Sequence, residues 1–393
     1  MRRLMVVASI VVFVDVAFYS AIVPLLPDYV QDLDLSKAQA GILSGAYAAG
    51  TLVASLPAGL LAARIGPRRT MVCGLLLLGL ASLSFGFAEH VLLLDAARFV
   101  QGVAGAMAWS GVITWLVLSA GETSRGAVIG TALGAAVAGE LLGPALGALA
   151  VGVGTKAVFS SVLVLVAVLI VAALRLPDVT PRQKESLRQV WRAMSSRPVV
   201  VATGLVALPS ILFGIVVVLV PLRIDELGAG SAVVAAGFIA GAALEAVLAP
   251  LMGRRSDRVG RQAPIATGYA ICAVGILVIP APDVLALVIA AVIVISVGAG
   301  ICFGPAMTML SDSAEATGLH QGLAAGLTNL AWASGQVTGS LGGGAAASAA
   351  GDWLPCYLIA AILLVSAASV RRIPLSLPGR SASRSPGAQG SQL

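Results

Sequence analysis

Three acidic residues and one arginine interrupt long apolar stretches of this chain, and their types are suited to proton chemistry. They are Asp15, Glu140, Glu245 and Arg98. A carboxylate at the middle of a membrane span costs about 2.5–3.5 kcal/mol on insertion scales, so such an acid is expected to be protonated, paired or solvated. Burial favours the neutral form of a carboxyl group, which then takes up and releases protons near neutral pH. We therefore predict that these four residues are the candidates for proton coupling.

The alternative for each acid is a purely structural contact, such as an ion pair between Glu140 and Arg98. Glu245 is equally open to a structural role in the second half of the chain. For Arg98 the alternative is a side chain that snorkels to the membrane surface. Gln101 lies three residues further on the same helix face, and Gly102 and Gly105 follow it. These neighbours favour a packed interior position for Arg98.

Polar and aromatic residues near position 330 are suited to contacting a substrate. Asn329, Trp332 and Gln336 follow one another at helical contact spacing. Trp332 either stacks on a substrate or packs within the protein. Three interior acids against one interior arginine favour a lipophilic substrate that is neutral or cationic. The substrate-binding candidates are Asp15, Tyr19, Gln101, Glu140, Asn329, Trp332 and Gln336.

The elements that must position these residues are membrane-spanning helices. Of the 393 residues, 59% are hydrophobic and 11% are charged, whereas soluble domains have about 25% charged residues. This composition predicts an all-α membrane protein, and the N-terminal apolar run is too long for a signal peptide. Twelve transmembrane helices are expected at 4–27, 38–62, 70–88, 93–118, 127–150, 155–174, 199–222, 231–252, 263–281, 284–310, 322–348 and 353–370.

The positions of the basic residues predict the orientation of these helices. All 24 Lys and Arg residues except Lys37, Lys156, Arg223 and Arg98 fall on one side of the membrane. Cytoplasmic loops accumulate Lys and Arg. We therefore expect a multi-pass protein of the cell membrane (plasma or bacterial inner membrane) with both termini in the cytoplasm. The net charge of +6 follows from this asymmetry and requires no nucleic-acid partner.

An internal repeat divides the chain into two halves. The basic segment that starts at Gly59 recurs 194 residues later at Gly253, and Glu140 recurs as Gln336 at an offset of 196. The repeat predicts two pseudo-symmetric six-helix bundles with a substrate site between them near the midplane. The expected parts are an N-terminal bundle (1–176), a cytoplasmic linker (177–198), a C-terminal bundle (199–373) and a disordered cytoplasmic tail (374–393).

A glycine stripe marks the fifth expected helix. Gly139, Gly143 and Gly147 recur every four residues beside Pro144. Such a stripe allows another helix backbone to approach closely, and proline tends to bend the helix. We expect a bendable packing element that also holds the carboxyl group of Glu140.

These motifs resemble those of the major facilitator superfamily, and in particular its twelve-helix drug:proton antiporters. The stretch from Gly130 to Ala148 resembles the antiporter motif of span 5, although Ala148 stands where the family has glycine. Arg98 with Gln101 resembles the arginine motif of span 4. The span-5 motif is the most specific, because it resembles exporters more than importers.

The loop between spans 2 and 3, from Gly59 to Arg69, resembles the loop motif of the same family. Ala63 stands where the family has an acid, and Pro67 where it usually has arginine. The acid is implied to help lock the two halves in one gate state, so here a lock must rest on other residues. The gating candidates are Gly59, Arg64, Gly66, Arg68, Gly253, Asp257, Arg258, Gly260, Arg261, Gly139, Gly143, Pro144 and Gly147.

The resemblance implies alternating access and export of a drug or amine-like compound in exchange for protons. The alternatives are proton-coupled uptake of a sugar or other metabolite, and a sensor that transports nothing. An enzyme is not expected, because His90 and His320 are isolated and no metal, cofactor or nucleotide motif appears. The four cysteines are expected to be core residues. The expected partners are a small-molecule substrate, protons and the lipid bilayer, and the chain is expected to be monomeric.

Overall fold

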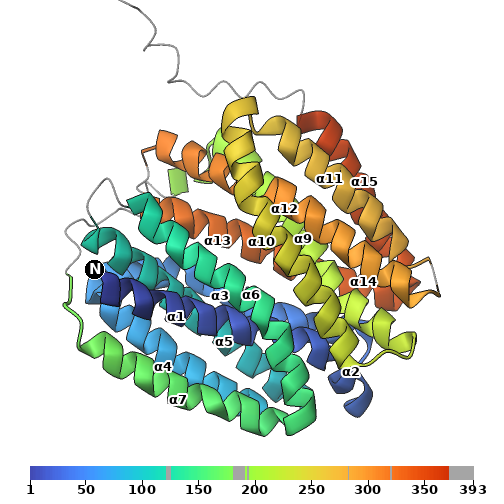
Figure 1. The fold of residues 1–393 in the computed structure, drawn as a ribbon, viewed down its shortest axis with the longest axis horizontal. Coiled ribbons are helices and arrows are strands. Elements are labelled where there is room, and N and C mark those ends of the chain that lie inside the picture. The colour runs from blue at the N-terminus through green and yellow to red at the C-terminus, as the bar shows by residue number, and fades with distance from the viewer. Residues whose placement is uncertain (121–124, 180–190, 193, 282, 319–320, 371–393) are drawn as a thin grey trace, which may run out of the picture.

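The computed structural model consists of α-helices packed side by side (Figure 1). It describes residues 1–393 except 121–124, 180–190, 193, 282, 319–320 and 371–393, and of residues 125–127, 257 and 321–325 it describes the backbone alone. No strand occurs among the described residues. The helices are α1 (Arg2–Ser20), α2 (Ile22–Asp32), α3 (Lys37–Ile65), α4 (Pro67–Gly86), α5 (Val91–Ser119), α6 (Arg125–Val153), α7 (Thr155–Leu174), α9 (Arg197–Glu226), α10 (Ser231–Val259), α11 (Gln262–Val278), α12 (Leu285–Ala316), α13 (Gln321–Val337), the π-helical turn η2 (Thr338–Gly342), α14 (Gly343–Ala350) and α15 (Trp353–Val370).

Twelve membrane spans follow from these helices within the described part of the chain. Helices α1 and α2 form one broken span, and α13, η2 and α14 form another. Ten helical segments are long and apolar enough to cross a membrane, and α11 is a shorter apolar helix of 17 residues. The expected all-α fold with twelve transmembrane helices is confirmed.

Glycine residues make the two equivalent basic turns of the repeat. Gly66 lies between α3 and α4 with φ of +96°, and Gly260 lies between α10 and α11 with φ of +90°. Residues with a Cβ rarely adopt this backbone conformation, so glycine is required at both turns. The sequence repeat therefore reflects a shared backbone geometry.

The first and eleventh spans are interrupted near the middle of the protein. The first span breaks at Ala21, three residues before Pro24, whose ring nitrogen has no hydrogen to donate. The eleventh span contains η2, which is followed by Gly343 and Gly344. By contrast, α6 is continuous through Pro144. The interruptions let these two spans present side chains at an angle that a straight helix does not allow.

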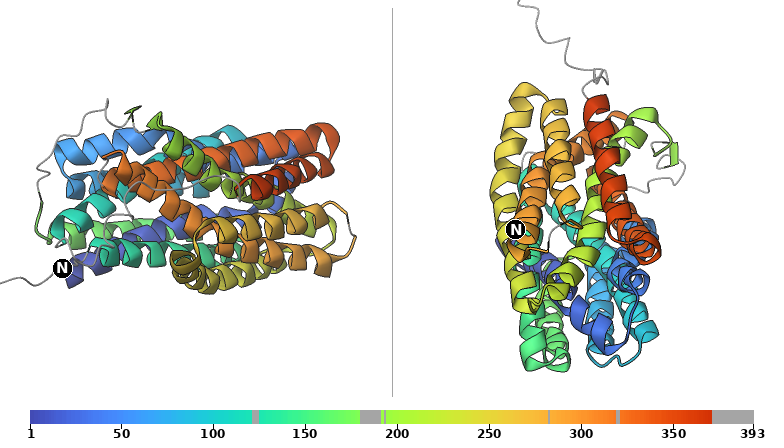
Figure 2. Two further views of the ribbon diagram at one scale, coloured as in Figure 1. Left: turned by 90° about the horizontal axis from the view of Figure 1, so that it is seen from above. Right: turned by 90° about the vertical axis from the view of Figure 1, so that its right-hand side faces the viewer.

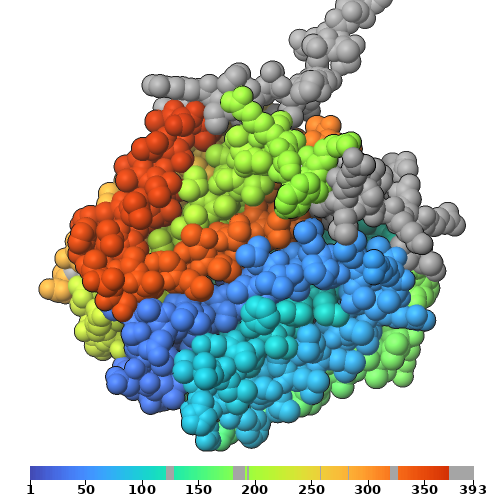
Figure 3. All heavy atoms as spheres, turned by 180° about the vertical axis from the view of Figure 1, so that it is seen from behind, coloured from blue at the N-terminus to red at the C-terminus, as the bar shows by residue number. Residues whose placement is uncertain are grey.

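The N-terminal half (α1–α7) and the C-terminal half (α9–α15) lie side by side (Figures 1 and 2). Within the halves, α3 and α4 pack on α5, and α10 and α11 pack on α12. Across the halves, α3 contacts α13 and α14, α6 contacts α10, and α2 contacts α9. Figure 3 shows the orange helices of the C-terminal half running beside the blue helix α3.

The glycine stripe of α6 packs against the first span, as its spacing predicts. A Cβ at Gly139 would lie 2.6 Å from the carbonyl oxygen of Phe13. A Cβ at Gly143 would overlap the hydroxyl of Ser20 and lie 2.6 Å from the carbonyl oxygen of Ala17. Small residues are therefore required where α6 touches α1.

The cysteines differ in their surroundings. Cys272, Cys302 and Cys356 are buried, as expected, but Cys73 is exposed. Cys73 lies on the face of α4 that points away from α5 and the core, so the expectation of a core position was wrong for this residue.

Contacts of charged residues between the halves lie at one end of the molecule. We call the end with Met1, Gly66 and Gly260 the basic end, and the end with Leu33 and Gly351 the opposite end. At the opposite end, Lys37 pairs with Glu226 at 3.1 Å and with Asp352 at 2.8 Å, and the amide of Gln31 donates to Asp225 at 2.7 Å. These contacts join α2 and α3 to the C-terminal half.

The ion pairs at the basic end lie within the halves. Arg68 pairs with Asp178, just after α7, at 3.1 Å, and Arg261 pairs with Asp312 of α12 at 2.6 Å. Among the described residues, no ion pair joins the two halves at this end. Among the described residues, the ion pairs that join the halves therefore lie at the opposite end.

Candidate functional site

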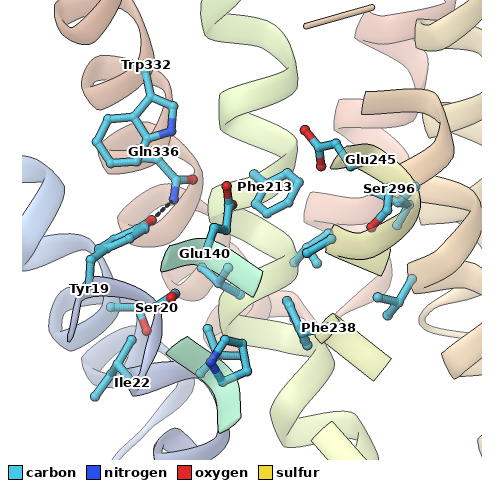
Figure 4. Close-up of a pocket in the computed structure, with 18 residues that line it drawn as sticks. Tyr19, Ser20, Ile22, Glu140, Phe213, Phe238, Glu245, Ser296, Trp332 and Gln336 are labelled. Carbon is cyan, nitrogen blue, oxygen red and sulfur yellow. Dashed lines mark hydrogen bonds between the residues drawn. The ribbon is translucent and has the colours of Figure 1, made fainter. Parts of the chain in front are cut away.

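A cavity that is partly open to the surroundings lies between the two halves (Figure 4). The N-terminal half contributes residues of α1, α2, α3 and α6, and the C-terminal half contributes residues of α9, α10, α12 and α13. Most of the lining is apolar or aromatic, and its described residues include no Lys, Arg or His. The polar residues of the lining are Tyr19, Ser20, Ser44, Glu140, Glu245, Ser296, Trp332 and Gln336.

Two carboxyl groups enter this cavity from different halves. Glu140 comes from α6 and Glu245 from α10, and both side chains point into the cavity in Figure 4. Both residues are partly buried. Within the described part of the chain, neither carboxyl group has a hydrogen-bond or ion-pair partner.

An aromatic wall and a hydrogen bond between the halves complete one side of the cavity. The ring of Tyr19 meets Trp332 edge to face, with ring centroids 5.6 Å apart. The side-chain amide of Gln336 donates a hydrogen bond to the hydroxyl of Tyr19. Phe213 and Phe238 line the cavity from α9 and α10. This wall offers aromatic ring surface to a bound molecule.

Asp15 belongs to a second polar cluster, inside the N-terminal half. The hydroxyl of Tyr47 in α3 donates to both carboxylate oxygens of Asp15 at 3.0 Å, and Asp15 is only 4% exposed. A Cβ at Gly105 would lie 2.8 Å from Asp15 Oδ1. The glycine of the arginine motif therefore makes room for this carboxyl group.

Arg98 is fully buried in the same cluster and binds neutral acceptors. One guanidinium nitrogen donates to Gln101 Oε1 at 3.0 Å and to the carbonyl oxygen of Phe18 at 3.3 Å, and the other donates to the carbonyl oxygen of Tyr19 at 3.0 Å. The guanidinium also lies 5.3 Å from the centre of the Tyr47 ring. Arg98 therefore fixes the backbone at the end of α1. It forms no ion pair with Glu140, so the structural alternative for that acid is not formed.

Tyr19 connects the two clusters. Its carbonyl oxygen accepts from Arg98, its ring lies 4.6 Å from the ring of Tyr47, and its hydroxyl faces the cavity. Tyr47 and Tyr19 therefore form a continuous series of contacts from Asp15 to the cavity.

The cavity includes some of the substrate-binding candidates and excludes others. Tyr19, Glu140, Trp332 and Gln336 line it together with Glu245. The remaining candidates, Asp15, Gln101 and Asn329, are not part of this lining.

Sequence reasoning missed Tyr47, Ser44, Phe213, Phe238 and Ser296. Tyr47 had a detectable signal, because it is a lone aromatic residue among the small residues of α3. The two phenylalanines had none, because an apolar residue in a span has the same pattern whether it faces lipid, core or cavity.

The gating candidates of the two loop motifs have different surroundings. Arg64 and Arg258 are exposed, whereas Arg68 and Arg261 form the ion pairs of the basic end. A Cβ at Gly59 or Gly253 would meet no atom within 4 Å. The side chain of Asp257 lies outside the described residues. No group of three potential metal ligands occurs in the part of the chain that the structure describes.

Twelve helices in two halves, with a cavity between them that both halves line, define the architecture of a membrane transporter. The family model described as Major Facilitator Superfamily matches residues 8–333 and 245–392 of the chain. The chain belongs to this superfamily, whose members are generally transporters rather than enzymes.

Individual relatives match shorter segments. The chain is 32% identical over 141 residues to a probable vesicular acetylcholine transporter-B of Danio rerio, covering 34% of this chain and 29% of the relative. It is 30% identical over 105 residues to multidrug resistance protein 2 of Bacillus subtilis, covering 27% and 26%. It is 29% identical over 125 residues to the MFS-type transporter ppzB of Metarhizium majus, covering 30% and 27%. The chain thus spans less than a third of the length of these relatives.

Proposed function

We propose that this protein exports a small lipophilic compound, neutral or cationic, in exchange for protons by alternating access. The observation that carries the proposal is the cavity with Glu140 and Glu245 entering from different halves and no basic residue in its lining. A drug-like or amine-like cation fits such a cavity, because carboxylates and aromatic rings both attract positive charge.

The two ends of the molecule differ in their content of Lys and Arg, and this difference supports a direction of transport. The basic end concentrates Lys and Arg, which favours placing it and both termini in the cytoplasm. The opposite end is then outside, where Lys37, Glu226 and Asp352 join the halves. In this orientation the ion pairs of Lys37 would hold the halves together on the outside, which supports a state that takes up an intracellular substrate.

Proton coupling is assigned to the acids in the spans. Asp15 is the first candidate. It accepts a hydrogen bond from Tyr47 and lies near Arg98, which also binds the backbone at the end of α1, so a change in the charge of Asp15 is expected to act on that helix end. Glu140 and Glu245 are further candidates, because a proton and a cation compete for the same carboxyl group. Two relatives are named for drug resistance, multidrug resistance protein 2 of Bacillus subtilis and the quinolone resistance protein NorA of Staphylococcus aureus, and these names support a drug-like substrate.

Proton-coupled uptake of a sugar or other metabolite is the second candidate on the same fold. The absence of basic residues from the described cavity lining and the match to a probable vesicular acetylcholine transporter favour a cationic substrate instead.

The proposal also includes the bundle boundaries at 176 and 199, the cytoplasmic linker, the monomeric state and a gating role for the two loop motifs.

The test is accumulation of ethidium in cells that express the wild type, Asp15→Asn, Glu140→Gln or Glu89→Gln. Glu89 is 78% exposed near the opposite end and serves as the matched control. We expect the wild type and Glu89→Gln to lower ethidium accumulation. A protonophore is expected to abolish this effect, and Asp15→Asn or Glu140→Gln is expected to abolish it as well. If the wild type and an empty vector remain alike across a chemically broad panel of cations, drug export is wrong.

A further inference from the structure

The cavity contains two acids and two further polar groups without partners. Gln336 is 2% exposed, and its Oε1 accepts no hydrogen bond, although its Nε2 is bound to Tyr19. Ser44 is 5% exposed, and its hydroxyl also has no partner. A buried polar atom without a partner costs about 1–3 kcal/mol. Since both atoms belong to residues of the cavity lining, they are available to a ligand that donates hydrogen bonds.

The two acids define the charge of such a ligand. Glu140 and Glu245 belong to different halves, and no cationic side chain lines the cavity to neutralise either of them. A ligand with one positive centre pairs with one carboxylate, and the other carboxyl group then stays protonated or carries a charge without a partner. A ligand with two positive centres pairs with both carboxylates, so neither charge is left without a partner in an apolar surrounding.

We propose that the cavity binds an organic dication with N–H donors, with one cationic group at Glu140 and the other at Glu245. This inference rests on the proposed function. Planar amidinium groups suit both carboxylates, because two parallel N–H donors bind one carboxylate. The linker between the cationic groups contacts Phe213 and Phe238, and an aromatic ring of the ligand packs against Tyr19 and Trp332.

A dication of this kind also bridges the halves. Because Glu140 and Glu245 move with different bundles, a ligand bound to both stabilises conformations that bring the bundles together around the cavity. A monocation bound to one acid has no such effect. The second charge thus contributes to specificity as well as to affinity.

The experiment compares hexamidine with 4-hexyloxybenzamidine, which contains one of its two cationic halves. Binding is measured by titration calorimetry on the purified full chain in lipid nanodiscs, without a proton gradient. The variants are Glu140→Gln, Glu245→Gln, Glu245→Asp and the exposed control Glu89→Gln. We expect the wild type and Glu89→Gln to bind hexamidine about tenfold more tightly than the monocation.

Each glutamine substitution is expected to weaken hexamidine binding about tenfold and to leave the monocation within about twofold. Glu245→Asp is expected to keep most of the preference, because it keeps the charge. Retained monocation binding shows that a variant is folded. Equal affinity of the wild type for both compounds, or equal weakening of both by the substitutions, would overturn the inference.

Measurements of transport distinguish failure of the dication site from failure of the proposed function. Proton-dependent transport of the monocation without any preference for hexamidine overturns the dication site and leaves proton-coupled export standing. If neither compound is transported but hexamidine binds with the expected preference, the dication site stands and export of this class fails.

Discussion

Gln336 donates a side-chain hydrogen bond to the hydroxyl of Tyr19, and this bond joins the two halves at the cavity. In the sequence repeat, Gln336 is the counterpart of Glu140. The two equivalent positions therefore differ in a simple way. The amide is bound to the opposite half, whereas the carboxyl group has no partner among the described residues. The repeat supplies one amide that connects the halves and one carboxyl group that faces the cavity.

Tyr19→Phe is expected to loosen the contact between the halves without removing the aromatic wall. The ring still packs on Trp332, but the bond to Gln336 is lost, at a cost of about 0.5–1.5 kcal/mol. We expect faster labelling of Ser44→Cys by a membrane-impermeant maleimide added from outside. Tyr357→Phe, an exposed residue of α15, is the control. Unchanged labelling relative to that control would contradict a role for the bond in closure.

Lys37→Ala is expected to open the opposite end. Lys37 neutralises Glu226 and Asp352, and Asp352 is only 14% exposed. Since Lys37 is 28% exposed, we expect about 1 kcal/mol, which is about a fivefold shift toward the outward-open form. The same outside labelling of Ser44→Cys measures this shift. The double variant Lys37→Asp with Asp352→Lys, which exchanges the charges, is expected to restore slow labelling. If neither Lys37→Ala nor the double variant changes the labelling rate, these ion pairs do not hold the opposite end closed.

Asp15→Asn is expected to separate driving force from binding. The amide cannot exchange a proton, but it still accepts a hydrogen bond from Tyr47. We expect loss of ethidium transport driven by a pH gradient in inverted membrane vesicles, with substrate exchange at equal pH retained. Tyr47→Phe, which keeps the acid, is expected to retain gradient-driven transport at a reduced rate. Gradient-driven transport by Asp15→Asn at the wild-type rate would remove Asp15 from the coupling mechanism.

Gly143→Ala is expected to destabilise the protein. The added methyl group would collide with Ser20 and the backbone of α1, at a cost of about 1–3 kcal/mol. Gly134→Ala in the same helix is the matched control, because its Cβ would meet no atom within 4 Å. Thermal unfolding in detergent is expected to shift downward for Gly143→Ala only. Equal melting temperatures of the two variants would show that the contact of α6 with α1 tolerates a side chain.

The fold was predictable because lipid leaves the backbone few options. In the absence of water, backbone groups must bond within the segment, so apolar runs of about twenty residues become helices. The twelve expected ranges therefore correspond to the twelve observed spans. The repeat from Gly59 to Gly253 likewise predicted two bundles, because equivalent turns require glycine at equivalent positions. The glycine stripe of α6 indicated its own close contact for the same local reason.

The composition of the site was predictable only in part. The cost of an acid in lipid singled out Asp15, Glu140 and Glu245 from sequence. It did not show that Asp15 belongs to the interior of one half with Tyr47, while the other two share a cavity.

The sequence by itself thus determined the number of spans, the repeat and the identity of the interior ionisable residues. The tertiary structure decided which of these residues meet, and where the first span breaks to place Tyr19 between Arg98 and Gln336. The physical reason is that hydropathy records how deep a residue lies in the membrane. The rotation of each helix about its axis and the choice of its neighbours depend on packing between helices distant in sequence.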